Sequence, residues 1–166
     1  MQNDVKTRPN VVFYLLGFVV AAAGIGLIVL GATGIATTVQ RYESPLRGSG
    51  PSALADGAAA VFWGFFVITM GRILWRGARR RGAKDHFGRL LMIIAMVIMG
   101  YALQSLLAGA PELWRSTTED QARSSLIAAY LPYVLLGIPA VVVGTIGGKL
   151  ANEKDELISV SATANF

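Results

Sequence analysis

The sequence predicts an all-α, polytopic membrane protein whose four transmembrane helices form one bundle. Three observations support this fold class: four long stretches without a charged residue, an apolar composition, and basic residues concentrated between two of the stretches. The uncharged stretches hold 32, 15, 22 and 25 residues, at 9–40, 57–71, 90–111 and 124–148. A helix needs about 20 apolar residues to cross the ~30 Å hydrocarbon layer. A water-soluble helix of this length would carry charges on its outer face.

Composition limits the functions that this chain can perform alone. Of its 166 residues, 54% are hydrophobic and 15% are charged, and the mean hydropathy is +0.53. The chain has no cysteine, which excludes disulfides, thiolate metal sites and iron–sulfur clusters held by its own side chains. A single histidine, His86, cannot supply two imidazole ligands to haem or copper. We therefore expect no cofactor and no metal, and we predict that the chain is not an enzyme.

The first predicted span covers about 11–37. Its apolar run is longer than the roughly 7–15 residues of a secretory signal core, which favours a transmembrane helix. Small residues recur along this span at intervals of four residues, a spacing that lets two helix backbones approach closely. We expect this face to pack against protein. The packing residues predicted here are Gly17, Ala22, Gly26 and Gly31.

The second predicted span covers about 54–75 and leads into the basic segment 72–89, which we expect to be a loop. Seven of the fifteen basic residues lie in this segment. Such a cluster can bind anionic phospholipid head groups or the acidic surface of a partner, or it can act only as a topology determinant. His86 and Asp85, within it, are interpreted as solvated. The predicted contact residues are Arg76, Arg79, Arg80, Arg81 and Lys84.

The third predicted span, about 90–108, has Gln104 as its most polar side chain and a candidate polar contact. Gly109 and Pro111 are expected to end the helix. An amide at this depth can line a polar path, but such groups more often bond to a neighbouring helix or to their own backbone.

The fourth helix is expected to begin at a capping box formed by Ser116 and Glu119, outside the bilayer. It would cross the bilayer at about 126–146, and its two prolines favour kinks. A polar tail follows at 149–166. Two further packing residues are predicted from their four-residue spacing: Gly144 and Gly148.

The distribution of lysine and arginine predicts the orientation. Eleven of these residues lie in the two terminal segments and the basic loop, and four lie in the other two connections. The positive-inside rule then predicts that both termini and the basic loop face the cytoplasm. This topology also accounts for the net charge of +5, so we expect no nucleic-acid partner. An abundance of alanine, glycine, valine and arginine favours a bacterial inner membrane.

The membrane centres contain no ionisable residue, which argues against a self-contained proton or ion pathway. The sequence therefore favours a non-catalytic accessory subunit of a larger bacterial inner-membrane complex, with an energy-transducing assembly for respiratory or photosynthetic electron transport as the first expectation. Its expected partners are other membrane subunits and anionic phospholipids. Two alternatives stay open. One is a self-associating channel or transporter whose fourth helix and Gln104 line a path. The other is a membrane-embedded lipid-modifying enzyme whose basic loop holds a phosphate.

Overall fold

Four helices make up nearly the whole described part of the chain. The computed structural model describes residues 11–41, 48–78 and 83–163. The helices are α1 (Val11–Arg41), α2 (Gly50–Gly77), α3 (Ala83–Arg115) and α4 (Glu119–Thr163). Each contains a stretch that is long and apolar enough to cross a membrane. The prediction of an all-helical, multi-pass membrane protein with four spanning helices is confirmed.

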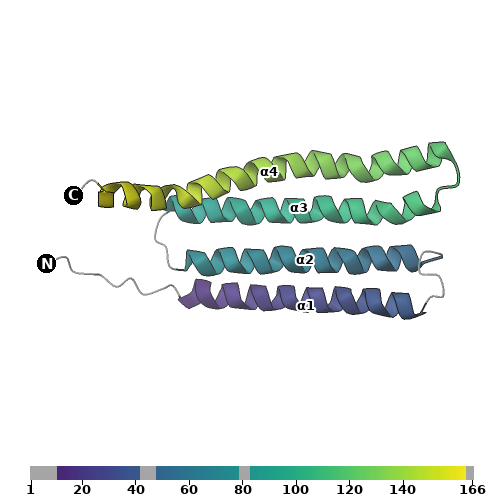
Figure 1. Ribbon diagram of the computed structural model, residues 1–166, viewed down its shortest axis with the longest axis horizontal. Helices are drawn as coiled ribbons and strands as arrows, with labels where there is room; N and C mark the ends of the chain where they lie inside the picture. Colours follow the sequence, from purple (N-terminus) through teal and green to yellow (C-terminus); the bar gives the residue numbers. More distant parts are fainter. Residues whose placement is uncertain (1–10, 42–47, 79–82, 164–166) are drawn as a thin grey trace.

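The four helices form an open bundle in which they lie side by side in chain order (Figure 1). α1 packs against α2, α2 against α3, and α3 against α4, whereas no other pair of described helices approaches at backbone distance. Neighbouring helices are antiparallel, so the start of α1 and the end of α4 lie at the same end as the connection between α2 and α3 (Figure 1). We call this the basic end. Among the described residues, α1 and α4 therefore each pack closely, backbone against backbone, with one helix only.

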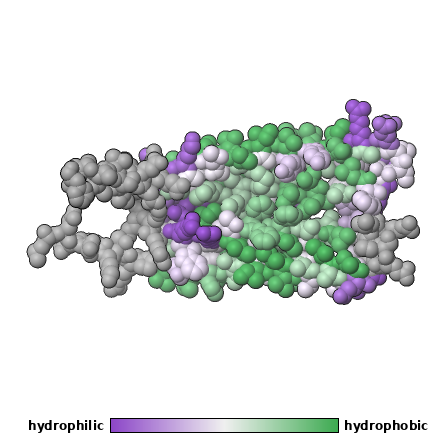
Figure 2. Space-filling view, viewed as in Figure 1, coloured by the Kyte–Doolittle hydropathy of each residue, from purple (hydrophilic) through white to green (hydrophobic). Residues whose placement is uncertain are grey.

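The surface has the polarity expected of a protein surrounded by lipid. Figure 2 shows apolar residues over the middle of the visible face and hydrophilic residues toward its two ends. Large apolar side chains on α1 and α4 are exposed, such as Val19 (61%) and Leu135 (62%). In water this surface would be costly, at roughly 25 cal/mol for each Å² of apolar area.

The backbones of α1 and α2 touch through glycines that recur every seven residues. A Cβ atom added at Gly17 would lie 2.8 Å from the Gly71 carbonyl oxygen, and one added at Gly71 would lie 2.6 Å from the Gly17 carbonyl oxygen. Any side chain at these positions would force the helices apart. The facing residues are Gly17, Gly24 and Gly31 in α1 and Gly71, Gly64 and Gly57 in α2.

α3 and α4 pack by the same principle with a mixture of glycine and alanine. Gly88 and Gly147 face one another, and a Cβ atom on either would lie 2.6 Å from the carbonyl oxygen of the other. Ala95, Ala102 and Ala140 are buried in the same helices. Since lipid is as apolar as leucine, such close backbone packing is a principal source of attraction between membrane helices. The fold thus consists of two tightly packed helical hairpins joined by the looser α2–α3 contact.

The helices extend beyond the predicted spans. Much of the segment 72–89, expected to be a loop, is helical, because α2 continues to Gly77 and α3 begins at Ala83. Likewise, the expected tail at 149–166 continues α4 as far as Thr163. Charged residues mark where a helix leaves hydrocarbon, but arginine and lysine are good helix formers, so the helix need not end there.

The two ends of the α3–α4 connection also differ from expectation. α3 passes through Pro111 and ends at Arg115, and Gly109 is a site of contact with Ala129 of α4. At the start of α4, the Gln121 backbone N–H donates to Thr118 Oγ1 at 3.4 Å. Thr118 and Gln121 therefore take the capping positions expected for Ser116 and Glu119. The Ser116 hydroxyl instead donates to the Leu113 carbonyl oxygen at 2.7 Å, which closes α3.

Candidate functional site

Two of the five predicted basic contact residues can be located at the basic end. Arg76 lies in the last turn of α2 and Lys84 in the first turn of α3, and both are exposed. The short connection between the two helices brings these side chains to the same end of the molecule. Arg79, Arg80 and Arg81 lie outside the described residues. The expected contact with anionic lipid or an acidic partner remains a prediction.

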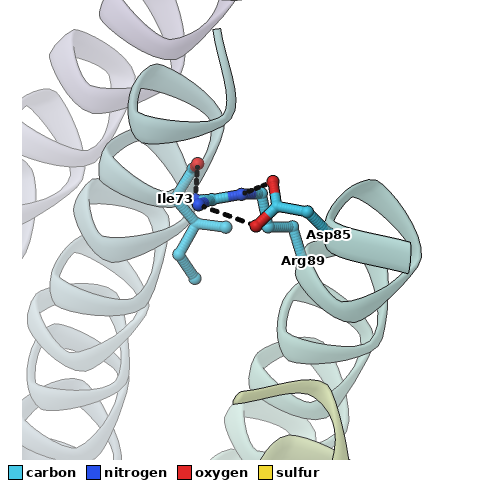
Figure 3. A network of polar contacts seen from close by, with 3 residues as sticks. All are labelled: Ile73, Asp85 and Arg89. Atoms are coloured by element: carbon cyan, nitrogen blue, oxygen red, sulfur yellow. Dashed lines mark hydrogen bonds and ion pairs between the residues drawn. The ribbon is translucent and has the colours of Figure 1, made fainter. Parts of the chain in front are cut away.

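Just inside the basic end, a buried network links α2 and α3 through an ion pair that lies within α3 (Figure 3). Arg89 donates from Nε to Asp85 Oδ2 at 2.9 Å and from Nη2 to Asp85 Oδ1 at 3.3 Å. Its Nη1 atom donates to the Ile73 carbonyl oxygen at 3.0 Å, across the interface. Asp85 is only 2% exposed. Two-pronged pairing of this kind fixes the guanidinium in one orientation, so the network sets how the two hairpins meet.

This ion pair differs from the expectation that Asp85 is solvated in a loop and that Arg89 belongs to the basic segment. The available signal was their four-residue spacing, which brings the two side chains together only if the segment is helical. Asp85 also lies in the first turn of α3, where the helix dipole favours negative charge. Arg89 therefore contributes to the α2–α3 contact, and its positive charge is paired with the Asp85 carboxylate.

A small apolar pocket of about 220 Å³ lies next to this network. It is formed by α1, α2 and α3, and His86 and Arg89 are the polar residues on its border. The His86 ring is exposed but stacks on Phe13 of α1, with the ring centroids 5.8 Å apart. The accessible lining is almost wholly apolar. The pocket therefore suits a hydrocarbon chain better than a phosphate group.

The predicted packing residues divide between inner and outer faces. Gly17 and Gly31 lie in the α1–α2 contact, and a Cβ atom on Gly144 would lie 3.3 Å from Ala95 Cβ in the α3–α4 contact. Ala22 and Gly26 lie on the exposed face of α1. Apart from the adjoining backbone of the same helix, no described atom lies within 4 Å of a Cβ atom built on Gly26 or Gly148. Packing of another protein against these positions remains a prediction.

Glycines in the sequence also recur every seven residues, which is a different pattern from the four-residue interval between Ala22 and Gly26. The interval that matters within the chain is seven residues, the repeat with which two helices keep one seam in contact. It identifies Gly24 together with Gly17 and Gly31, and Gly64 together with Gly57 and Gly71.

Gln104 joins α3 to α2 near the middle of the membrane. Trp63 Nε1 donates a hydrogen bond to Gln104 Oε1 at 3.0 Å. The Trp63 ring also packs edge to face against Tyr101, at a centroid distance of 5.4 Å. Gly100 makes room for the indole, since a Cβ atom there would lie 2.6 Å from a ring carbon. The amide therefore bonds to a neighbouring helix.

Three threonine hydroxyls within the membrane-spanning helices bond to their own backbone. Thr33, Thr69 and Thr145 donate to the carbonyl oxygens four residues earlier, at 2.9, 2.8 and 2.6 Å. A hydroxyl satisfied in this way needs no water or second helix. These side chains consequently provide no continuous polar path through the chain.

The fold and these contacts define a multi-pass membrane protein of two antiparallel helical hairpins. In the part of the chain that the structure describes, no three histidine, aspartate or glutamate side chains gather where they could hold a metal ion. Comparison of the chain with protein-family models, curated proteins and solved structures finds no match.

Proposed function

We propose that this chain is a non-catalytic structural subunit that packs side by side with other membrane proteins in a larger complex. The observation that carries the proposal is the open row of helices. In the most apolar part of each helix, only 11–17% of the residues are buried within the chain. Both outer helices therefore present most of their length to whatever surrounds the protein.

Lipid could cover these exposed helices without any protein partner. The residues on the exposed face of α1 indicate which of the two is favoured. On the exposed face of α1, Ala22 and Gly26 leave a shallow strip with no side chain above it. Small residues four apart allow a second helix to approach closely enough for extensive van der Waals contact. A lipid chain gains less from such a strip because it must also lose conformational freedom there. This reasoning favours a protein partner on α1.

The basic end supports a second element of the proposal, the binding of anionic phospholipid. Arg76 and Lys84 are exposed where the helices would leave the hydrocarbon. Each basic residue near an anionic membrane surface contributes about 1 kcal/mol of attraction. The positive-inside rule assigns this end to the cytoplasm. We propose a bacterial inner membrane, with an energy-transducing complex as the first host to test, because small non-catalytic subunits are common in such assemblies.

The two alternatives have less support. A channel needs a continuous polar lining, but the threonine hydroxyls bond to their own backbone. A lipid-modifying enzyme needs a phosphate-sized polar pocket beside an acid or base. The pocket beside His86 is apolar, and the nearby carboxylate of Asp85 is held by Arg89.

Site-specific cross-linking in host membranes tests the proposed partner. A photoreactive amino acid at Ala22 should capture one reproducible membrane protein, and Gly26→Leu should abolish this product. The matched control is the same probe at Leu135, a bulky exposed position on α4. Lipid adducts alone at Ala22, as at a purely lipid-facing position, would contradict the proposal.

A further inference from the structure

A second, larger pocket lies between α1, α2 and α3, toward the end of the molecule opposite the basic end. Its volume is about 350 Å³, within the range of small-molecule sites. Four alanines and Leu27 provide an apolar wall, while Asp56, Trp63 and Gln104 add polar groups. The alanines leave the space that larger side chains would fill.

The hydrogen bond between Trp63 and Gln104 fixes the orientation of the glutamine amide. An indole N–H can only donate, so the glutamine must present its oxygen to Trp63. Its Nε2 atom then carries two N–H groups, and the exposed Gln104 side chain borders the pocket. Among the described residues, no acceptor forms a hydrogen bond with this Nε2 atom. The pocket thus contains an unused pair of donors.

The depth of Gln104 makes these unused donors significant. Gln104 lies eleven residues from Arg115 and fifteen from Arg89, or about 16 Å and 22 Å along the helix. A hydrocarbon layer of ~30 Å placed between those two charges includes this position. Water is scarce there, so a donor that faces hydrocarbon without a partner is destabilising. An oxygen acceptor on a lipid-soluble molecule would remove that cost.

Asp56 restricts the charge of such a molecule. It lies seven residues before Trp63 on α2, about 10 Å nearer the membrane surface. Asp56 is exposed on the pocket border. A carboxylate at this entrance repels an anionic head group and tolerates a neutral one. The pocket therefore favours an uncharged body with a single well-placed oxygen.

From these contacts we infer that the pocket binds an uncharged or zwitterionic lipid-soluble molecule through a carbonyl oxygen, which accepts a hydrogen bond from Gln104 Nε2. The apolar part of the molecule lies against the alanines and Leu27. Two sources share this chemistry: a quinone ring and the acyl ester of a phospholipid. The inference is independent of the proposed structural role, because a subunit with or without protein partners can carry such a site.

Tryptophan fluorescence provides a direct measurement. The chain has three tryptophans, so the double variant Trp75→Phe/Trp114→Phe leaves Trp63 as the reporter. In nanodiscs of ether-linked phosphatidylcholine, which lack ester carbonyls, a short-chain quinone should quench Trp63 fluorescence saturably. Gln104→Leu should weaken the apparent affinity about 5-fold, the equivalent of ~1 kcal/mol for one hydrogen bond. Ser105→Ala is the matched control, since Ser105 bonds to the Ala102 carbonyl oxygen and does not border the pocket.

A second arm distinguishes the two sources. Native mass spectrometry of protein from ester-linked and ether-linked phosphatidylcholine would show whether one ester lipid is retained, and whether Gln104→Leu releases it. Saturable quenching identifies a quinone, whereas ester-dependent retention identifies a phospholipid. If Gln104→Leu does not fold, Ala59→Leu reduces the pocket volume while keeping both Trp63 and Gln104, and should abolish either signal. Non-saturable quenching together with equal retention of both lipids would overturn the inference.

Discussion

Gly24 of α1 and Gly64 of α2 face one another with no side chain between their backbones. A Cβ atom on Gly24 would lie 2.7 Å from the Gly64 carbonyl oxygen, and one on Gly64 would lie 2.6 Å from the Gly24 carbonyl oxygen. Side-chain atoms of Ile68 and Ile28 lie equally close, but the carbonyl oxygens belong to the backbone, so full relief requires the helices to move apart. The α1–α2 hairpin therefore depends on glycine at this point.

The first prediction concerns this contact. Gly24→Ala should lower the free energy of unfolding by about 1–3 kcal/mol, the usual range for overpacking. Gly26→Ala is the control: no atom lies within 4 Å of the added methyl group, and alanine has a higher helix propensity by about 1 kcal/mol. Unfolding by sodium dodecyl sulfate, followed by circular dichroism, measures both. Equal effects at the two positions would contradict the packing described for α1 and α2.

The second prediction separates folding from association. Gly26→Leu should leave the unfolding curve close to that of the wild-type protein, because position 26 faces away from α2. The same change should reduce co-purification with the proposed partner at least several-fold, because a bulky side chain blocks close approach. Gly144→Leu is less informative, since its side chain would meet Ala95 inside the α3–α4 hairpin. Unchanged co-purification of Gly26→Leu would remove α1 as the partner surface.

The third prediction concerns the buried ion pair. Arg89→Met leaves the Asp85 carboxylate, 2% exposed, without its cation, and should lower the free energy of unfolding by about 3–5 kcal/mol. The double variant Asp85→Leu/Arg89→Met removes both charges and should recover most of that loss. The midpoints of detergent-induced unfolding compare the two variants. A double variant as unstable as the single one would show that uncompensated charge is not the cause.

The fourth prediction tests orientation. The absence of cysteine allows single thiols to be introduced without background labelling. Ala83, the first residue of α3, and Thr117, two residues after its last, are exposed at opposite ends of the bundle. In intact cells, a membrane-impermeant maleimide should label Thr117→Cys and spare Ala83→Cys, whereas both should react after lysis. Labelling of Ala83→Cys alone would reverse the topology inferred from the positive-inside rule.

Much of the fold could be predicted from the sequence because bilayer thickness imposes a strong constraint on uninterrupted apolar runs. Helix ends are harder to locate, since Arg72 and Lys149 each end an uncharged stretch while the helix continues beyond them. The arrangement of helices in a row could not be predicted from composition. It depends on which glycines face which, as Gly24 and Gly64 show.

The site residues were predictable to a smaller extent. Gln104 stood out as an amide in an apolar helix, but its bond to Trp63, 41 positions earlier, requires knowledge of which helices are neighbours. Asp85 and Arg89 were visible as a four-residue pair, yet their charge suggested a loop. Ala22 and Gly26 match a packing pattern equally well whether the partner lies inside or outside the chain. Residue spacing alone does not show whether a helix face packs within the chain or against another protein.

Native mass spectrometry of the wild-type chain, purified from its own host in mild detergent, tests the structural-subunit proposal most directly. The proposal predicts stoichiometric retention of at least one other membrane protein, lost in Gly26→Leu and kept in Gly26→Ala. Recovery of the chain alone, as a monomer or as a homo-oligomer, would contradict it.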